Sequence, residues 1–193
     1  PGPDSLTADA PLASTSGVGA ATSRLAGAER YSSAVAISRW QYADTSRASV
    51  VYLARGDDFA DALTAGTLRD GPVLLTRGGC GDVPGSVLAE IRRIDPGQVI
   101  ALGGPVAVCD AALETAAQGR PTDRIGGESR AETAALVARR AFPGGADRVY
   151  LTRGALGPDA VVGGSLSDGP ILLTNADGSG IPSATAAAVQ SLA

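Results

Sequence analysis

The stretch Leu53-Ala54-Arg55-Gly56-Asp57-Asp58-Phe59-Ala60-Asp61-Ala62-Leu63, followed by Gly71-Pro72-Val73-Leu74-Leu75-Thr76, decides the fold because it occurs twice in the chain. Residues 151–161 and 169–174 repeat it at a constant offset, since 153 − 55 and 170 − 72 are both 98. The stretch 24–30 recurs at 124–130, and 124 − 24 gives an offset of 100. Repetition at a fixed period indicates that one structural unit has been duplicated.

Strands and helices alternate within the repeated unit. In the first copy we expect helices over 30–41, 58–68, 84–94 and 106–118, and strands over 49–54, 72–76 and 98–102. In the second copy, apolar residues at helical spacing follow a capping box made by Ser129 and Glu132, and a strand is expected over 148–152. This alternation is typical of the α/β class, in which helices cover both faces of a parallel sheet.

Composition excludes several classes of function. All 16 basic residues are arginine, and the formal net charge of −4 argues against a nucleic-acid binder, which needs a basic face. The chain has no histidine, which excludes Ser-His-Asp and Cys-His nucleophiles and imidazole metal ligands. No apolar run approaches the ~18 residues of a membrane-spanning helix.

The repeat divides the chain into three parts. Residues 1–23, rich in Pro, Ala, Ser, Thr and Gly, are predicted to be a disordered or linker segment. The first unit is predicted to span 24–121, and the second, incomplete unit 122–193. Ala193 aligns with Asp95, so the second copy lacks a partner for the strand 98–102. We therefore expect one of two alternatives: either the native chain continues, or another segment or subunit covers this edge.

Two cysteines, Cys80 and Cys109, each follow a predicted strand. In a parallel sheet both lie beyond the carboxyl edge, where they are able to meet. Two inert buried thiols are the alternative, but we favour a disulfide, which would contribute about 3–4 kcal/mol in the chain-entropy model. A disulfide predicts an oxidising, extracytoplasmic setting.

Four motifs, in order, carry a family resemblance: residues 24–31, 54–63, 71–76 and 102–108. With their second copies they resemble the cell wall binding repeat type 2 family. The resemblance implies flavodoxin- or Toprim-like α/β repeats that usually occur in threes and pack as a pseudo-threefold trimer. It also implies non-covalent attachment of surface proteins to anionic polymers of the Gram-positive wall, often beside a separate enzymatic domain.

Candidate ligand-binding residues lie where strands end, because open α/β sheets bind ligands at the carboxyl ends of their strands. They are Arg55, Arg77, Arg153, Thr76, Thr174, Gly103 and Gly104. The glycines open a predicted helix, whose free amides could bind a phosphate, but we favour a tight turn as their role. For Arg55 and Arg153 we favour structural ion pairs with Asp61 and Asp159. Arg30 and Arg130, the shared motif arginines, are also assigned structural roles.

An enzyme or a solute-binding domain is the alternative. Asp57, Asp58 and Asp61 could act as paired carboxylates on a glycoside, but the second copy replaces Asp57 and Asp58 with Ala155 and Leu156. The stretch 175–186 starts like a calcium loop but has Ala186 where the loop needs a bidentate Glu. We therefore expect no metal and no cofactor.

The sequence thus predicts a non-catalytic module that anchors a secreted protein non-covalently to an anionic cell-wall polysaccharide or teichoic-type polymer. The expected location is the cell wall or the extracellular space. Further expected partners are another copy of the chain or an additional repeat that completes a pseudo-trimer; no nucleic acid and no membrane span are expected.

Overall fold

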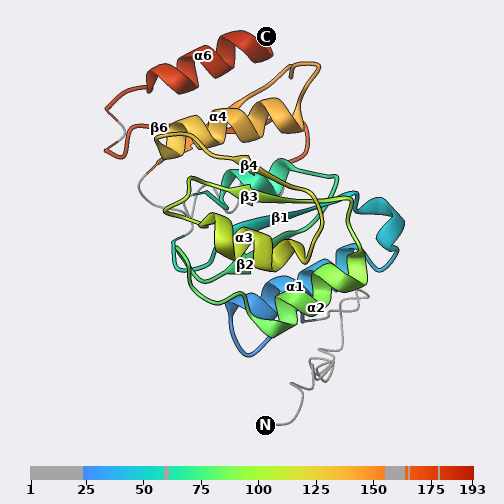
Figure 1. Ribbon diagram of the computed structural model, residues 1–193. Coiled ribbons are helices and arrows are strands. Elements are labelled where there is room, and N and C mark those ends of the chain that lie inside the picture. Colours follow the sequence, from blue (N-terminus) through green and yellow to red (C-terminus); the bar gives the residue numbers. More distant parts are fainter. Residues whose placement is uncertain (1–23, 59–60, 155–163, 165, 178) are drawn as a thin grey trace, which may run out of the picture.

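A parallel four-stranded sheet forms the centre of the computed structural model, which describes residues 24–58, 61–154, 164, 166–177 and 179–193 (Figure 1). Its strands are β1 (Val50–Arg55), β2 (Val73–Thr76), β3 (Gln98–Leu102) and β4 (Thr122–Ile125), in the order β2-β1-β3-β4. The central strand β1 is a buried apolar run, as expected for a parallel sheet covered on both faces.

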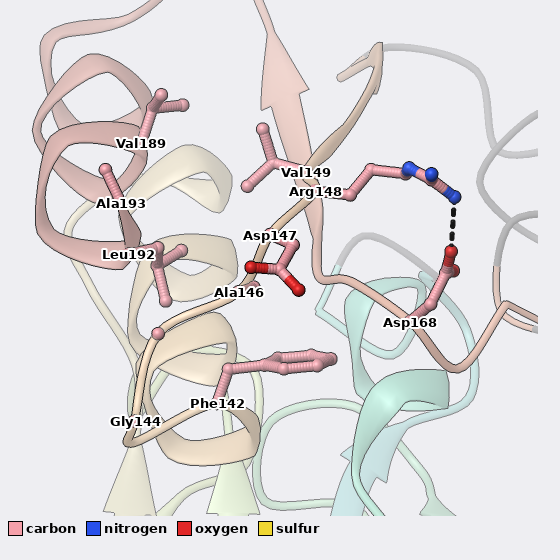
Figure 2. Close-up of a pocket in the computed structure, with 11 residues that line it drawn as sticks. Phe142, Gly144, Ala146, Asp147, Arg148, Val149, Asp168, Val189, Leu192 and Ala193 are labelled. Atoms are coloured by element: carbon pink, nitrogen blue, oxygen red, sulfur yellow. Dashed lines mark hydrogen bonds and ion pairs between the residues drawn. The ribbon is translucent and has the colours of Figure 1, made fainter.

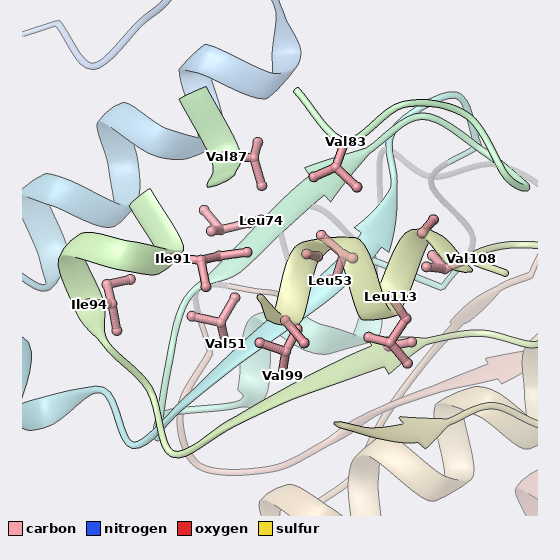
Figure 3. Close-up of a cluster of buried hydrophobic side chains, with 14 of the residues drawn as sticks. Val51, Leu53, Leu74, Val83, Val87, Ile91, Ile94, Val99, Val108 and Leu113 are labelled. Atoms are coloured by element: carbon pink, nitrogen blue, oxygen red, sulfur yellow. The ribbon is translucent and has the colours of Figure 1, made fainter. Parts of the chain in front are cut away.

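Three helices cover one face of this sheet: α1 (Arg30–Gln41), α2 (Gly85–Ile94) and α3 (Asp110–Ala117). Alternate strand residues such as Val51, Leu53 and Val99 point into this core, where Val87 and Ile91 of α2 meet them (Figure 3). Pro84 precedes the first turn of α2, and Asp95 ends the helix in the left-handed conformation. The first copy therefore has a complete core on this side.

The opposite face of the sheet is covered largely by the second copy. A short 3-10 helix, η2 (Thr64–Thr67), lies there beside α4 (Arg130–Ala141), whose Val137 is fully buried. Val137 packs in one cluster with Tyr52, Leu68 and Ile100. The two repeats thus share a hydrophobic core. In a doubly wound sheet the crossover helices of the same unit cover both faces, but here α4 of the second copy covers one face of the first sheet.

The second copy forms a smaller layer of its own. Strands β5 (Tyr150–Arg153) and β6 (Ile171–Thr174) pair in parallel, and α6 (Ser183–Leu192) packs on α4 and β6. Buried alanines of α4 meet Leu172, Ala188 and Leu192. A further 3-10 turn, η1 (Thr45–Arg47), links α1 to β1 in the first copy.

The predicted α/β class with parallel sheets flanked by helices is confirmed, and the helices over 30–41 and 84–94 agree closely with α1 and α2. The prediction of a helix over 58–68 is wrong: in the described part of that range only Thr64–Thr67 is helical. The Thr67 hydroxyl donates to the Thr64 carbonyl, a local bond that competes with an α-helix. The helix expected over 106–118 begins later, at Asp110.

Strand β4 was not predicted at all. It begins at Thr122, the position where we placed the boundary between the units, and it pairs with β3 of the first copy. The second segment of the chain therefore starts by completing the sheet of the first. The predicted linker 1–23 lies outside the described residues.

Candidate functional site

The motif arginines make the same contact in both copies. Arg30 donates from Nη1 to the carbonyl of Gly56 at 2.5 Å, and Arg130 donates to the carbonyl of Gly154 at 2.5 Å. Each arginine thereby connects the start of its helix to the turn after the next strand, which is β1 in the first copy and β5 in the second. The geometry supports a structural role for both residues.

The Arg55 guanidinium lies at the carboxyl edge of the first sheet, but its partner is not the one expected. It donates from Nε and Nη2 to the two oxygens of Asp57, at 2.9 and 2.7 Å. These bonds lower the pKa of Asp57 to about 2. The expected pairing of Arg55 with Asp61 is wrong, because Asp57 follows in the same tight turn and offers both oxygens to the guanidinium.

Asp61 belongs to the joint between the two repeats. Burial raises the pKa of its carboxyl group, and a hydrogen bond with Thr133 of α4 counteracts this in part. The Thr133 hydroxyl in turn accepts from the amide of Gly127 at 3.1 Å. A Cβ on Gly103 would overlap the Asp61 carboxylate, so glycine is required where the two approach. Asp61 therefore has a structural position facing the second repeat.

Arg77 is an exposed cation at this edge. It follows β2, next to the turn after β1, because Arg55 and Thr76 are register partners. Within the described part of the chain, no hydrogen bond or ion pair engages its guanidinium. Its neighbour Gly78 lies against Asp57, whose oxygens would be 2.5 Å from a Cβ there. Arg77 is thus available to a ligand on a loop packed against the Arg55–Asp57 pair.

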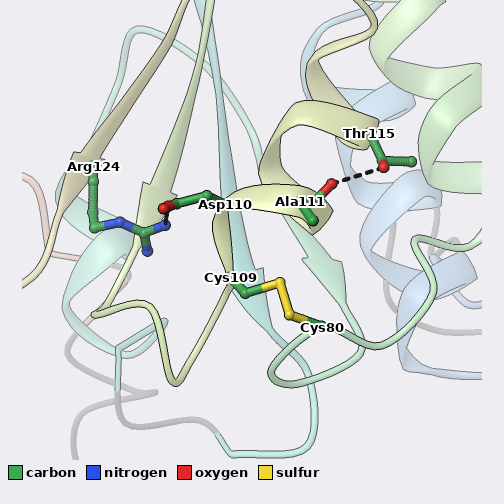
Figure 4. Close-up of a disulfide and its surroundings, with 6 residues drawn as sticks. All are labelled: Cys80, Cys109, Asp110, Ala111, Thr115 and Arg124. Atoms are coloured by element: carbon green, nitrogen blue, oxygen red, sulfur yellow. Dashed lines mark hydrogen bonds and ion pairs between the residues drawn. A yellow bond between two sulfur atoms is a disulfide. The ribbon is translucent and has the colours of Figure 1, made fainter.

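A disulfide joins this loop to the start of α3 (Figure 4). Cys80 and Cys109 are bonded at an S–S distance of 2.00 Å. Beside it, Gly79 and Val108 form an isolated parallel bridge, in which the Gly79 amide donates to Ala107 and the Cys109 amide donates to Gly79, each at 3.0 Å. The loop 77–81, which begins with Arg77, is therefore cross-linked to the loop between β3 and α3.

The other proposed ligand residues of the first copy are less accessible. Thr76 is fully buried and its hydroxyl has no hydrogen-bond partner among the described residues, so it cannot contact a surface ligand. Gly103 is buried; its amide donates to Ile125 and its carbonyl accepts from Arg124. Gly104 borders open space. We therefore remove Thr76 and Gly103 from the candidate site.

Arg153 and Thr174 lie in the other sheet, at the ends of β5 and β6. Arg153 is exposed, and the Thr174 hydroxyl donates to the carbonyl of Asn175 at 3.2 Å. The structure thus brings Arg55 and Arg77 to one edge and places Arg153 at another. The expected partner of Arg153, Asp159, lies outside the described residues.

Sequence reasoning missed Arg124, which connects three elements. It donates from Nη1 to the Gly103 carbonyl at 2.9 Å. It also donates from Nη2 to Asp110 at 2.8 Å, and Figure 4 shows these two side chains together. It therefore fixes β4, the turn after β3 and the first turn of α3. The signal was present, because Arg24 and Arg124 are matching residues of the repeated motif.

The structure also contains a hollow of about 770 Å³ in the second copy (Figure 2). It lies between Phe142, the start of β5 and the end of α6, near the ion pair of Arg148 with Asp168. Val149, which lines it, matches Val51, whose neighbour in the first copy is β3. The hollow is therefore lined by a residue whose counterpart in the first copy pairs with β3.

Neither a metal centre nor a bilayer-spanning helix is found in the described ranges. No group of three or more Cys, Asp or Glu side chains there is arranged to hold a metal ion. Every helix described is too short or too polar to cross a membrane.

Comparison with known proteins places the repeat in a family. The family described as "Cell wall binding domain 2 (CWB2)" matches residues 24–113 and 124–191, which are the two copies. The chain belongs to this family. It is 31% identical over 159 residues to the N-acetylmuramoyl-L-alanine amidase LytC of Bacillus subtilis, a match that covers 79% of the chain and 31% of the amidase.

Solved structures agree on the fold. Cwp6 from Clostridium difficile superposes with a TM-score of 0.71 and 29% identity, over 93% of this chain and 30% of that one. Cwp8 from the same organism has a TM-score of 0.61 at 19% identity, over 79% of this chain and 26% of its own length. The chain spans about a third or less of these relatives, so the match concerns the cell wall binding repeats and not their whole length.

Proposed function

We propose that the chain is a non-catalytic module that holds a secreted protein on an anionic cell-wall polymer, either an acidic polysaccharide or a teichoic-type polymer. Membership of the cell wall binding family supports binding to the wall. The observation that carries the site is Arg77, an exposed guanidinium without a partner among the described residues, at the carboxyl edge of the complete sheet. The location outside the cytoplasm is supported by the disulfide.

The physical chemistry favours short-range recognition. A guanidinium binds carboxylate or phosphate oxygens through two parallel hydrogen bonds, which suits the repeating acid groups of a polymer. With a formal net charge of −4, the chain as a whole repels an anionic polymer at long range. Affinity must therefore come from local contacts and should fall as salt rises, since screening acts over about 10 Å at 0.1 M ionic strength.

Substitution of Arg77 tests the site. Arg77→Ala should weaken retention on purified walls about tenfold, the loss of one charge-assisted contact of roughly 1.4 kcal/mol. Arg47→Ala is the matched control, because Arg47 is also exposed but precedes β1, at the opposite end of the strands. Extraction of the anionic polymers from the walls should abolish binding of the unmodified chain.

The assignment has clear ways to fail. Equal retention of the Arg77→Ala and Arg47→Ala variants removes Arg77 from the site, and an unmodified chain that ignores walls removes the function. Unchanged binding after extraction of the anionic polymers moves the ligand to another wall component. Release of wall fragments by the chain alone would contradict the absence of catalysis.

We further propose that α1 is an assembly surface for another repeat unit. By the offset of 100, Ile37 of α1 matches Val137 of α4, yet Ile37 is 47% exposed and Val137 is fully buried against the first sheet. Trp40, which matches Arg140, is 68% exposed. The same helix face is thus covered in one copy and open in the other, which supports an additional repeat or a second chain as its partner.

A further inference from the structure

The two copies close the loop after their second strand in different ways. In the first copy the loop is Arg77-Gly78-Gly79-Cys80-Gly81, with a cation at its start and a cysteine that is cross-linked. In the second copy Asn175 replaces the arginine, and the Asn175 amide donates to the Gly180 carbonyl at 2.9 Å. The second loop closes on itself, whereas the first is fastened to a neighbouring loop. The cation and the cross-link occur together.

The first loop has little other means of holding its shape. Three of its five residues are glycine, which loses more conformational entropy on ordering than any other residue. Besides the disulfide and the packing of Gly78 against Asp57, its backbone hydrogen bonds among the described residues are the two of the Gly79–Val108 bridge and one in which the Gly81 amide donates to Gly78 at 3.2 Å. Cys80 itself is exposed.

The anchor at the other end of the cross-link is rigid. Cys109 is the residue before α3, packs partly against the main core and donates its amide to Gly79. Asp110, the first residue of α3, is tied to Arg124 of β4. The disulfide therefore connects a glycine-rich loop to a point that is fixed by both a helix and a strand.

We propose that the Cys80–Cys109 disulfide positions Arg77 for ligand binding, beyond any contribution to global stability. This inference rests on the proposed function. A ligand that meets a loose loop must order it and loses that entropy from its affinity, whereas a cross-linked loop is ordered in advance. The Arg77 contact should therefore be worth much less once the disulfide is removed.

A double-mutant cycle on the full chain measures this coupling. The four proteins are the unmodified chain, Arg77→Ala, Cys80→Ala with Cys109→Ala, and the triple variant. Each is assayed for retention on purified walls at a temperature where melting curves show it folded. Arg77→Ala should weaken retention about tenfold in the disulfide-bonded chain and less than about twofold in the cysteine-free chain.

A cross-link that only stabilises the fold would leave the Arg77 effect at about tenfold in both backgrounds, and that result overturns the proposal. If Arg77→Ala has no effect even with the disulfide intact, the assignment of Arg77 fails and the proposal with it. If the unmodified chain ignores walls, the proposed function itself fails. The three failures are distinguishable within one set of assays.

Reduction of the folded chain replaces the cysteine-free variant should that variant not fold. A dithiol such as dithiothreitol supplies two electrons and two protons, which convert the disulfide into two thiols, and it leaves as a cyclic disulfide. The same difference in the Arg77→Ala effect is expected between the oxidised and reduced proteins. Amide exchange at Gly79 and Cys109 should also accelerate on reduction; unchanged exchange, with an unchanged Arg77 effect, contradicts a positioning role.

Discussion

Glu90 shows how a single buried carboxylate needs hydrogen-bond donors from the helices around it. Its side chain is fully buried between α1 and α2, and it accepts from Ser38 at 2.7 Å, from Arg39 at 3.1 Å and from Arg93 at 2.7 and 2.9 Å. Arg93 also donates to the Tyr42 carbonyl. In the second copy the matching positions of Ser38 and Glu90 are the buried alanines Ala138 and Ala188. The helix pair α1–α2 is thus joined by a buried hydrogen-bond network, whereas the matching pair α4–α6 is joined by an apolar contact between alanines.

Glu90→Ala should destabilise the first repeat by about 3 kcal/mol, because it leaves a buried hydroxyl and two guanidiniums without their acceptor. Urea denaturation measures the loss. Adding Ser38→Ala, which recreates the alanine pair of the second copy, should cost little more than Glu90→Ala alone, since both changes remove the same network. Additive losses would show that Ser38 has an independent role.

The same carboxylate predicts a pH dependence. Burial raises the pKa of Glu90, but the hydrogen bonds from Arg93, Ser38 and Arg39 outweigh burial, so the net pKa lies below the ordinary value of 4.5. The unfolded chain therefore takes up its proton first as pH falls. The stabilisation is complete above the unfolded pKa and is lost as pH falls through the folded pKa.

Denaturation of the unmodified chain and of Glu90→Gln over a pH series tests this. The difference in unfolding free energy between the two should be largest above about pH 5 and should narrow as the pH falls below about 4. A difference that stays constant over this range would mean that Glu90 is not the titrating group.

At the residue scale, the repeated motif arginines make matching contacts in the two copies, whereas a contact that crosses between the copies could not be predicted from the sequence. Arg30 and Arg130 are shared by both motifs, and each binds the carbonyl of the matching glycine. Asp61 was paired with Arg55 because both residues recur in the second copy. Its contact with Thr133 depends on how α4 docks on the first repeat, which no local pattern records.

At the scale of elements, one helix template occupies two environments. The helices α1 and α4 have equal lengths and matching starts, so local sequence predicts both. Their packing differs: α4 has one face on α6 and another on the first sheet, whereas the main contacts of α1 with the described elements are to α2 and to β2 of its own sheet. Burial of α4 on two sides explains why it is rich in alanine where α1 carries larger side chains.

This difference gives a matched pair of variants. Val137→Ala should destabilise the chain by about 2 kcal/mol, because it removes buried methyl groups from the core shared by the repeats. Ile37→Ala, at the matching position of α1, should cost less than about 0.5 kcal/mol because its side chain is half exposed. Thermal melts compare them, and equal losses would contradict the docking of α4 seen here.

Other elements could not be predicted from local sequence for identifiable reasons. Strand β4 reads Thr122-Asp123-Arg124-Ile125, and its polar, partly exposed residues carry neither an alternating pattern nor an apolar run. It is a strand because the edge of β3 is available to it. The helix predicted over 58–68 fails for a different reason, because its local pattern suits a helix but its surroundings do not. The chain forms a tight turn there that contains Gly66, and Gly66 approaches Gly164 of the second copy.

At the scale of the whole molecule, the interface between the two copies contains a tyrosine–aspartate–arginine cluster that can be compared with the matching surface of the second copy. In the inner interface Arg140 of α4 pairs with Asp70, which also accepts from the Tyr52 hydroxyl at 2.8 Å. Burial and this carboxylate raise the pKa of Tyr52. In the second copy the same tyrosine–aspartate pair, Tyr150 and Asp168, is bonded at 2.8 Å, and its arginine is Arg148, which lies two residues before β5.

The outer face of the second copy therefore needs no arginine from an approaching helix. The exposed face of α1 has Trp40 at the position of Arg140, so the helix lacks the arginine in the copy whose counterpart has Arg148 beside the tyrosine–aspartate pair. An indole ring can lie over a guanidinium such as that of Arg148 through a cation–π contact. Trp40 of α1 and Arg148, which precedes β5, are thus chemically matched for a contact between repeat units.

The last prediction follows from the open face of α1. A chain with Ile37 and Trp40 exposed side by side should associate through this face with a repeat unit of a second chain, so its mass by light scattering should rise with concentration. Trp40 is the sole tryptophan, and its fluorescence should shift to the blue as the complex forms. Trp40→Asp should keep the chain monomeric, while Arg47→Ala, on the turn beyond α1, should associate normally. A constant monomer mass, with the emission of an exposed indole at every concentration, would show that α1 does not bind a second copy of this chain.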